Sequence, residues 1–222
     1  MPAILTIARL FFIDKNGRQK AIDAFHDIIE FTTPNEPEVL QYVCALPMDD
    51  SLGTEIYMIE EYTNHEAQDM HLATKPVQNL LQLFSTDDIL AQPPEVHNCP
   101  FVAKKTFGSP LPISSTPAIV LLNYPSKSGS AIQSAGKWEE IAEISISKDQ
   151  GISNLAVVED KDANSIRVQC VARDWNAFAD FQASVLDCSA GDVEMVKIKP
   201  IDGFLSRQGR HDMCKLQVCI KL

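Results

Sequence analysis

His71 is the side chain in this sequence best suited to acid–base chemistry. A histidine titrates near neutral pH, so its imidazole can take a proton from a bound molecule. Its neighbours Met70, Leu72 and Ala73 are mostly apolar, which favours a helix whose histidine faces the protein interior. The same pattern fits a histidine that packs in the core or bonds a carbonyl group at the helix end. We take His71 as the candidate base.

Five further side chains are candidates for a site around this base. Tyr42 and Tyr57 lie on predicted strands, where each hydroxyl group could point into a cavity or sit at the rim of an ordinarily packed sheet. Trp138 and Trp175 could form a pocket wall or simply fill the core. Asn123 stands near the end of an apolar strand; it could orient a substrate or face solvent.

Several other chemistries are excluded by spacing. The segment GSAIQSAGKW, residues 129–138, has glycines too far apart for a phosphate loop and a tryptophan where the hydroxyl should be. No G-x-G-x-x-G follows a predicted strand. His65, Glu66 and His71 superficially suggest a zinc helix, but the two histidines are six residues apart, not four. We therefore expect no phosphate loop, no classical dinucleotide site and no metal.

Composition and charge narrow the partners and the compartment. The chain has 222 residues, of which 45% are hydrophobic and 22% charged, and its net charge is −11. Such a surface disfavours nucleic acids and anionic membranes, and no apolar run is long enough to span a bilayer. The six cysteines are scattered without C-x-x-C spacing, so we expect reduced thiols and a cytoplasmic protein. They are Cys44, Cys99, Cys170, Cys188, Cys214 and Cys219.

The candidate residues must be held by elements that occur twice in the same order. Six of the thirteen prolines lie between residues 92 and 117, a density incompatible with a helix or a central strand. We read residues 108–117 as a linker between domains at 1–107 and 118–222. The first half predicts a strand at 4–12, a polar turn at 14–18, a helix through 21–29, strands at 39–46 and 54–62, a helix at 64–73 and a strand at 102–107. The second half predicts strands at 117–124, 152–159, 165–173 and 193–198, with helices through 132–142 and at 175–186.

This repeated β-α-β-β-α-β order is that of the ferredoxin-like unit, an antiparallel sheet with two helices on one face. One such sheet leaves its second face bare, and that face must be covered. We therefore predict an α+β protein in which tandem ferredoxin-like repeats pack sheet on sheet, as a dimeric α+β barrel formed within one chain.

The first half resembles the antibiotic biosynthesis monooxygenase (ABM) domain. The segment 54–84 carries Glu61-Tyr62 at a strand end and then His71 with Thr74 three residues later, in the order of the family's motif. The segment 38–42 resembles the family's turn and strand. In the second half Phe181 stands where His71 stands in the first, and Leu155 where Tyr42 stands, so we expect any chemistry to lie in the first half.

The resemblance implies a small apolar cavity between sheet and helices, and three function classes. The first is a cofactor-independent monooxygenase that combines molecular oxygen with a small aromatic or polyketide-derived substrate in secondary metabolism. The second is a polyketide cyclase or isomerase on the same barrel. The third is a non-catalytic binding or assembly module. A haem-degrading enzyme would need a histidine ligand after the second helix, and neither segment 77–84 nor segment 185–190 contains a histidine. The sequence leaves open whether the molecule pairs again as a homodimer.

Overall fold

The computed structural model describes residues 2–125, 151–184 and 193–207. The helix predicted through residues 132–142, with Trp138, lies outside the described residues. So do Cys188, Cys214 and Cys219. We call residues 2–107 the first half and residues 118–207 the second half.

The first half follows the predicted element order, with a third helix before its last strand. Its strands are β1 (Ile4–Phe11), β2 (Val39–Pro47), β3 (Glu55–Tyr62) and β4 (Glu95–Thr106), and its helices are α1 (Lys15–Asn35), α2 (His65–Leu72) and α3 (Lys75–Thr86). The prediction of a polar turn at 14–18 is wrong, because α1 already begins at Lys15. Asp14 is the N-cap of this helix and accepts a 2.7 Å hydrogen bond from the Gly17 amide. Asn64 caps α2 in the same way, bonding the Ala67 amide at 2.9 Å.

The described second half has four strands and one helix, preceded by a short 3-10 turn η1 (Ile113–Ser115) in the segment that joins the halves. The strands are β5 (Ala118–Pro125), β6 (Ile152–Asp160), β7 (Ser165–Ala172) and β8 (Glu194–Phe204), and the helix is α5 (Trp175–Ser184). The hairpin β6–β7 corresponds to β2–β3 in the first half. The domain division at 108–117 stays a prediction.

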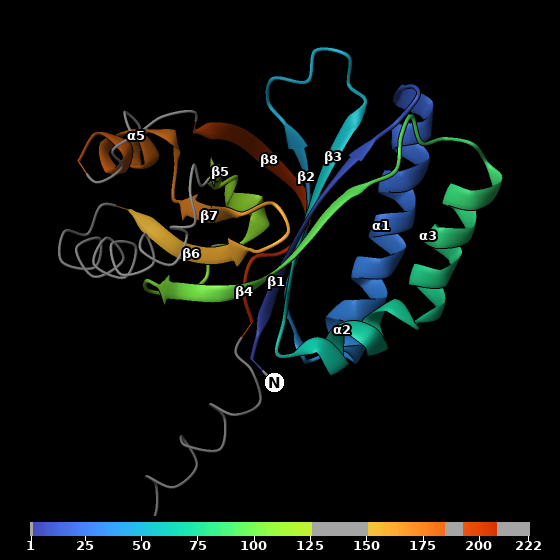
Figure 1. Cartoon of the computed structure of the whole chain (residues 1–222), viewed down its shortest axis with the longest axis horizontal. Coiled ribbons are helices and arrows are strands. Elements are labelled where there is room, and N and C mark those ends of the chain that lie inside the picture. Colours follow the sequence, from blue (N-terminus) through green and yellow to red (C-terminus); the bar gives the residue numbers. More distant parts are fainter. Residues whose placement is uncertain (1, 126–150, 185–192, 208–222) are drawn as a thin grey trace, which may run out of the picture.

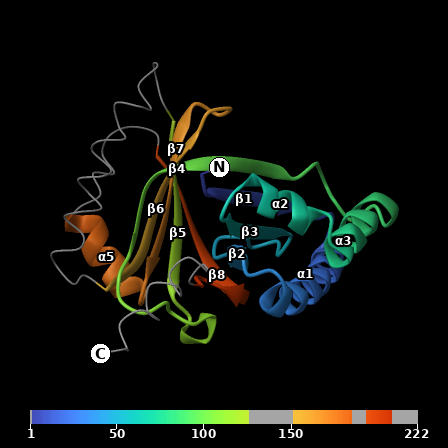
Figure 2. The ribbon, with the colours of Figure 1, turned by 90° about the horizontal axis from the view of Figure 1, so that it is seen from below.

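Eight strands close into one barrel in the order β1-β3-β2-β8-β5-β7-β6-β4, and every neighbouring pair is antiparallel. The barrel confirms the predicted α+β fold with tandem repeats. Figures 1 and 2 show it standing between two helical layers, with α1, α2 and α3 on one side and α5 on the other. None of the described helices combines the length and hydrophobicity that a transmembrane helix needs.

The last strand of each half passes into the other half. β4 pairs with β1 as far as Pro100 and with β6 from Phe101. β8 pairs with β5 as far as Ile198 and with β2 from there to Phe204. The expectation that no strand would include the proline-rich segment around Pro100 is therefore wrong. The proline is tolerated because β4 changes partner there, beside a register shift.

Successive side chains on each strand point to opposite faces of the sheet, and this divides the buried apolar residues into three hydrophobic cores. Inward side chains from both halves fill the barrel, among them Leu5, Val43, Ile59, Ile119, Val158 and Ile198. Outward side chains of the first half's strands, among them Ile4 and Met58, pack against helix residues such as Phe25, Ile28 and Leu80. In the second half, Leu155 and Val168 of the strands pack with Phe178 and Phe181 of α5. The sheet therefore has two buried faces, and neighbouring residues on a strand point into different compartments.

Candidate functional site

The predicted base, His71, lies in the last turn of α2 and is bonded to a carboxylate. Only 1% of its surface is exposed. Its Nδ1 atom lies 2.9 Å from Oε2 of Glu36, the residue that ends α1. The same carboxylate oxygen accepts a 2.6 Å hydrogen bond from the hydroxyl group of Thr32. Glu36 is therefore held from two directions, and it in turn orients the imidazole ring.

Two tyrosines from the sheet flank the imidazole. The ring centroid of Tyr42 on β2 lies 5.1 Å from that of His71, and the centroid of Tyr62 on β3 lies 5.6 Å away. Both hydroxyl groups bond Glu60, that of Tyr62 at 2.5 Å. We name these five residues (Glu36, Tyr42, Glu60, Tyr62 and His71) the helix-covered cluster. The structure thus brings together two predicted residues, His71 and Tyr42.

The two carboxyl groups of the cluster have opposite pKa shifts. Burial raises the pKa of Glu36, but hydrogen bonds from His71 and Thr32 outweigh it, so the pKa of Glu36 ends below its ordinary value. Burial dominates at Glu60 and raises its pKa, against the opposing effects of His71 and Tyr62. Because Glu36 is ionised and can only accept, the proton of a neutral His71 resides on Nδ1. Nε2 then carries the lone pair that a base needs.

Residues of the second half hold this cluster in place. Tyr42 pairs with Phe204 of β8, and the amide of Arg207 bonds the Leu40 carbonyl oxygen at 2.9 Å. The guanidinium group of Arg207 also donates to the carbonyl oxygens of Thr33 and Glu36, both at 3.1 Å. β8 therefore fixes the strand that carries Tyr42, and Arg207, which follows β8, fixes the end of α1 that carries Glu36.

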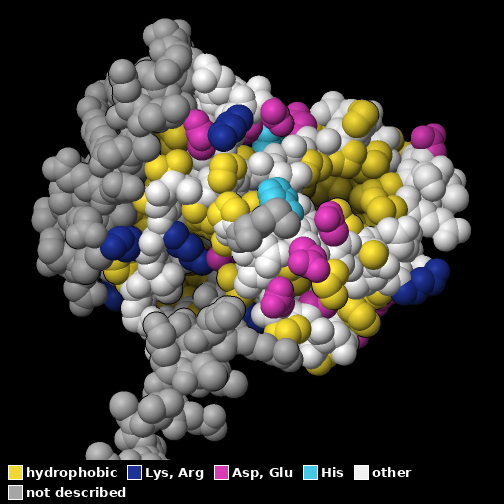
Figure 3. Space-filling model, turned by 60° about the horizontal axis from the view of Figure 1, so that its bottom comes forward, with side chains coloured by type: hydrophobic (Ala, Val, Ile, Leu, Met, Phe, Trp, Pro, Cys, Tyr) yellow, Lys and Arg dark blue, Asp and Glu magenta, His cyan; other side chains and the backbone are white. Residues whose placement is uncertain are grey.

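A hollow opens on the same side of the molecule. Figure 3 shows a depression lined with hydrophobic side chains on the side that bears the helices of the first half, with acidic side chains scattered around it. Apolar residues at the margin of the first core remain partly exposed, including Ile22, Leu83, Phe84 and Leu90. An apolar molecule can therefore find hydrophobic surface beside the helices that cover His71.

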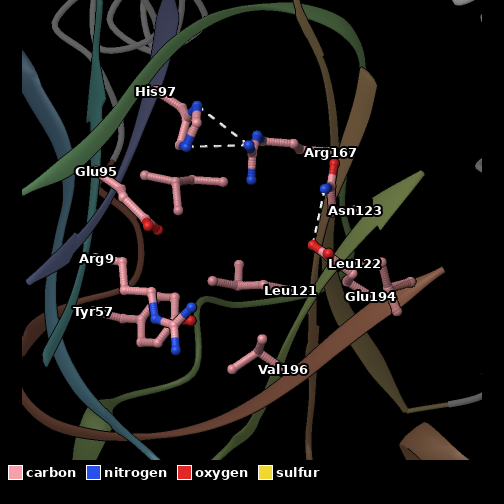
Figure 4. A pocket seen from close by; sticks show the side chains of 11 residues that line it. Arg9, Tyr57, Glu95, His97, Leu121, Leu122, Asn123, Arg167, Glu194 and Val196 are labelled. Carbon is pink, nitrogen blue, oxygen red and sulfur yellow. Dashed lines mark hydrogen bonds between the residues drawn. The ribbon is translucent and has the colours of Figure 1, made fainter. Parts of the chain in front are cut away.

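Tyr57 and Asn123 lie on the opposite face of the sheet, away from His71. They line a cavity of about 130 Å³ at one end of the barrel interior, which we call the barrel-end cavity. Its walls come from both halves, as Figure 4 shows. The remaining lining residues are Ile7, Arg9, Glu95, His97, Leu121, Leu122, Arg167, Glu194 and Val196. The structure therefore divides the predicted site residues between two places.

A buried aspartate organises one wall of the barrel-end cavity. Asp160 accepts a 2.7 Å bond from Nε of Arg167, and its carboxylate lies 2.8 Å from Nδ1 of His97. An amino group of Arg167 also lies 3.2 and 3.1 Å from the two ring nitrogens of His97. If this Arg167 nitrogen lay in the plane of the His97 ring, at nearly equal distances from Nδ1 and Nε2, it would collide with Cε1, the carbon between them. The guanidinium group therefore lies against the face of the imidazole.

Trp175, the one remaining predicted site residue that the structure describes, belongs to neither site. Trp175 begins α5 and packs edge-on against Phe178, with ring centroids 6.5 Å apart, in the second helix–sheet core. Burial raises the pKa of Cys44, Cys99 and Cys170 to about 12 in each case, so these three free thiols are not activated nucleophiles. Among the described residues, no three histidine, cysteine or acidic side chains are grouped to hold a metal.

Sequence reasoning missed both carboxylates of the helix-covered cluster. Glu61, which we paired with Tyr62 as the matching motif, points into the barrel, where its carboxylate is 2.5 Å from Nζ of Lys104. Glu60 is the carboxylate that faces the helices, as expected for the same face as Tyr62 two residues on. Glu36 has no motif of its own.

Comparison with solved structures shows the same fold in whole chains. A Fusobacterium nucleatum protein named provisionally as a monooxygenase matches with a TM-score of 0.79 at 13% identity, over 94% of this chain and 96% of that one. A similarly named Lactobacillus acidophilus protein matches with a TM-score of 0.72 at 15% identity, over 94% and 98%. An anthrone oxidase-like protein matches with a TM-score of 0.60 at 10% identity, over 92% and 94%. No family model and no curated protein matches the sequence.

These full-length matches define the class of fold. The chain has the tandem α+β barrel architecture of monooxygenase-like proteins, with both repeats in one polypeptide. At such low identities the likeness shows the fold, and the chemistry has to be argued from the residues of this chain.

Proposed function

We propose that the protein is a cofactor-independent monooxygenase that oxidises a small aromatic or polyketide-derived molecule of secondary metabolism, of the anthrone type. The observation that supports this most directly is the buried His71–Glu36 pair between the rings of Tyr42 and Tyr62. Molecular oxygen is the second substrate. We place the reaction in the cytoplasm, because the three described cysteines are free thiols.

The proposed reaction uses His71 Nε2 as the base. An anthrone-type substrate loses a proton from its methylene carbon to Nε2, and the resulting carbanion is electron-rich enough to pass an electron to oxygen. Recombination forms a carbon-bound hydroperoxide. Loss of the second proton from the same carbon and cleavage of the O–O bond then give a ketone and water. One oxygen molecule thus converts one CH₂ group into a C=O group and one water molecule, with no external reductant.

Glu36 and Tyr42 support this step without touching the substrate. The ionised Glu36 keeps the Nδ1 proton in place and stabilises the imidazolium ion that forms when Nε2 takes a proton. Tyr42 fixes the ring orientation through its contact with His71 and through its hydroxyl bond to Glu60. The hydrophobic surroundings exclude water from a carbanion that water would quench.

A second candidate is a non-catalytic module, and the closure of the cluster favours it. His71 is 1% exposed and Tyr62 is fully buried, so α2 or α3 must move before Nε2 can meet a substrate. A polyketide cyclase or isomerase would use the same base without consuming oxygen.

Oxygen consumption separates these functions. We would supply a hydroxyanthrone to the full chain in chelator-treated buffer and compare His71→Ala with His65→Ala, an exposed histidine on the same helix. We expect uptake to fall about 10²- to 10⁴-fold in His71→Ala, as for the loss of a general base, and to stay unchanged in His65→Ala. Thermal unfolding of both variants shows whether they remain folded.

Each other result contradicts a defined part of the proposal. Uptake that survives in a folded His71→Ala variant would remove His71 from the mechanism. Substrate conversion without oxygen uptake would indicate a cyclase or isomerase. No uptake by the parent protein would overturn the oxygenase proposal for anthrone-type substrates.

A further inference from the structure

The barrel-end cavity is built like a ligand site, although it lies on the other face of the sheet from His71. Its volume of about 130 Å³ is close to that of a cavity known to hold one benzene molecule, about 150 Å³. Ile7, Leu121 and Val196 supply apolar lining, and the ring of Tyr57 supplies an aromatic wall (Figure 4). A single ring or a short chain of similar size therefore fits.

The two cations of this cavity are already neutralised. Arg9 bonds Glu55 through Nε at 2.8 Å and through a terminal amino group at 2.7 Å. Arg167 bonds the buried Asp160 at 2.7 Å. Burial raises the pKa of Asp160, but hydrogen bonds from the Ala163 amide and Arg167 outweigh it and leave that pKa lowered. Neither guanidinium group is therefore available as an uncompensated charge for an anion.

The charged groups of the cavity that lack an ionic partner are carboxylates. The carboxylates of Glu95 and Glu194 approach from opposite walls in Figure 4, and neither forms an ion pair within the described part of the chain. Asn123 donates its amide nitrogen to Glu194 at 3.1 Å, while its Oδ1 atom is buried without a donor. This buried oxygen is closed to the cavity, so the carboxylates are the acceptors that a bound molecule can reach.

Electrostatics at Tyr57 shows that both carboxylates act on the same space. Burial raises the pKa of Tyr57 to about 12; Arg9 opposes this, while Glu95 and Glu194 contribute to it along with Glu55. The phenol is therefore neutral at physiological pH. The guanidinium carbon of Arg9 already lies 5.7 Å from the ring centroid, so the ring serves a ligand as an aromatic wall. Negative charge without an ionic partner and an aromatic wall together call for a ligand that is small and positively charged.

We propose that the barrel-end cavity binds a small organic cation, an ammonium or amidinium group carried on a single ring or short chain. The N–H groups would donate to the carboxylates of Glu95 and Glu194. The apolar part would contact Ile7, Leu121 and the ring of Tyr57. This site is independent of the helix-covered cluster, and it needs both halves because its walls come from both.

Calorimetric titration of the full chain with three matched ring compounds tests the proposal. Benzamidine carries the positive charge, benzyl alcohol is neutral and benzoate is negative. We expect benzamidine to bind more tightly than benzyl alcohol, with an affinity that falls as salt is added, and benzoate to show no binding. Glu95→Gln and Glu194→Gln should each weaken benzamidine binding about two- to fivefold, the range for a partly exposed charge pair. The exposed Glu66→Gln on α2 is the control and should not weaken it.

Two results would overturn the inference. Benzoate binding as tightly as benzamidine would show that the arginines, not the carboxylates, decide the charge of the ligand. Benzamidine binding that is absent, or unchanged in the Glu95→Gln, Glu194→Gln double variant, would show that this cavity is not the site. His71→Ala should leave benzamidine binding intact, so failure of the monooxygenase proposal and failure of this one are distinguishable.

Discussion

Replacing Gly203 by alanine gives the sharpest test of how the two halves are joined. Gly203 lies on β8 with φ at +109°, a conformation that side chains rarely adopt. A Cβ atom there would lie 2.0 Å from the carbonyl oxygen of Tyr42 and 3.0 Å from the Cα atom of Val43. Both contacts are with backbone, so no side chain can rotate away. β8 has to move from β2.

The size of the effect follows from two contributions. Alanine at a positive φ costs about 1–2 kcal/mol. Separation of β8 from β2 around Tyr42 and Phe204 breaks about two hydrogen bonds, each contributing about 0.5–1.5 kcal/mol. We therefore expect Gly203→Ala to lower the free energy of unfolding by about 2–5 kcal/mol. Gly108 offers a matched control, because its φ is +64° and nothing lies within 4 Å of its Cβ position. Gly108→Ala should lower the free energy of unfolding only by the strain of alanine at a positive φ, about 1–2 kcal/mol.

Urea unfolding followed by fluorescence and circular dichroism would give both free energies from the shift in midpoint. The two variants must unfold with slopes like that of the parent for the comparison to hold. If Gly203→Ala is no more destabilising than Gly108→Ala, then the close approach of β8 to Tyr42 does not constrain the barrel, and our account of how the second half positions Tyr42 is wrong.

Two further predictions concern charged pairs. The hydrogen bond and charge of Asp202 raise the pKa of His26, so the stability that this pair adds is fully present below the ordinary histidine pKa and disappears as pH rises through the higher folded-state pKa. His26→Gln should therefore destabilise the protein at pH 5.5 and have little effect at pH 9 in thermal melts; an equal loss at both would exclude the ion pair as the cause. Lys104→Met leaves the buried Glu61 carboxylate without its partner and should lower the free energy of unfolding by about 3 kcal/mol. In urea unfolding, the double variant Lys104→Met, Glu61→Leu should recover most of that loss. A double variant as unstable as the single one would show that packing, not charge, is responsible.

The local elements could be predicted because each has a local cause. Spacing of Ala21, Phe25 and Ile28 indicated α1, and both hairpins followed from apolar runs bounded by turn residues. The position of Pro100 in a strand could not be predicted in this way, because it depends on where β4 exchanges β1 for β6. Long-range pairing of this kind has no signal within the strand itself.

In the candidate sites, too, the residues with a local signal could be predicted and those brought together by long-range contacts could not. His71 followed from residue type and helix context, but its partner Glu36 is separated from it by 35 residues and stands in no motif. Tyr57 could not be assigned to a face, since the residues on both faces of β3 are buried and the alternation of polar and apolar residues that normally marks the inner face is missing. Tyr57 lines the same cavity as Asn123 only because the strands of both halves close into one barrel.

The exchange of β4 and β8 within one polypeptide has a consequence for how the sequence can change. In a barrel made by two identical chains, each substitution occurs twice and must suit both sides of a symmetric interface. In this protein a substitution in one half occurs only once, so it has to be compatible only with the residues of the other half. One half can therefore keep His71 while its counterpart carries Phe181, and a cavity that both halves line can have different residues on its two sides. Linkage also makes the association intramolecular, so the barrel does not come apart on dilution.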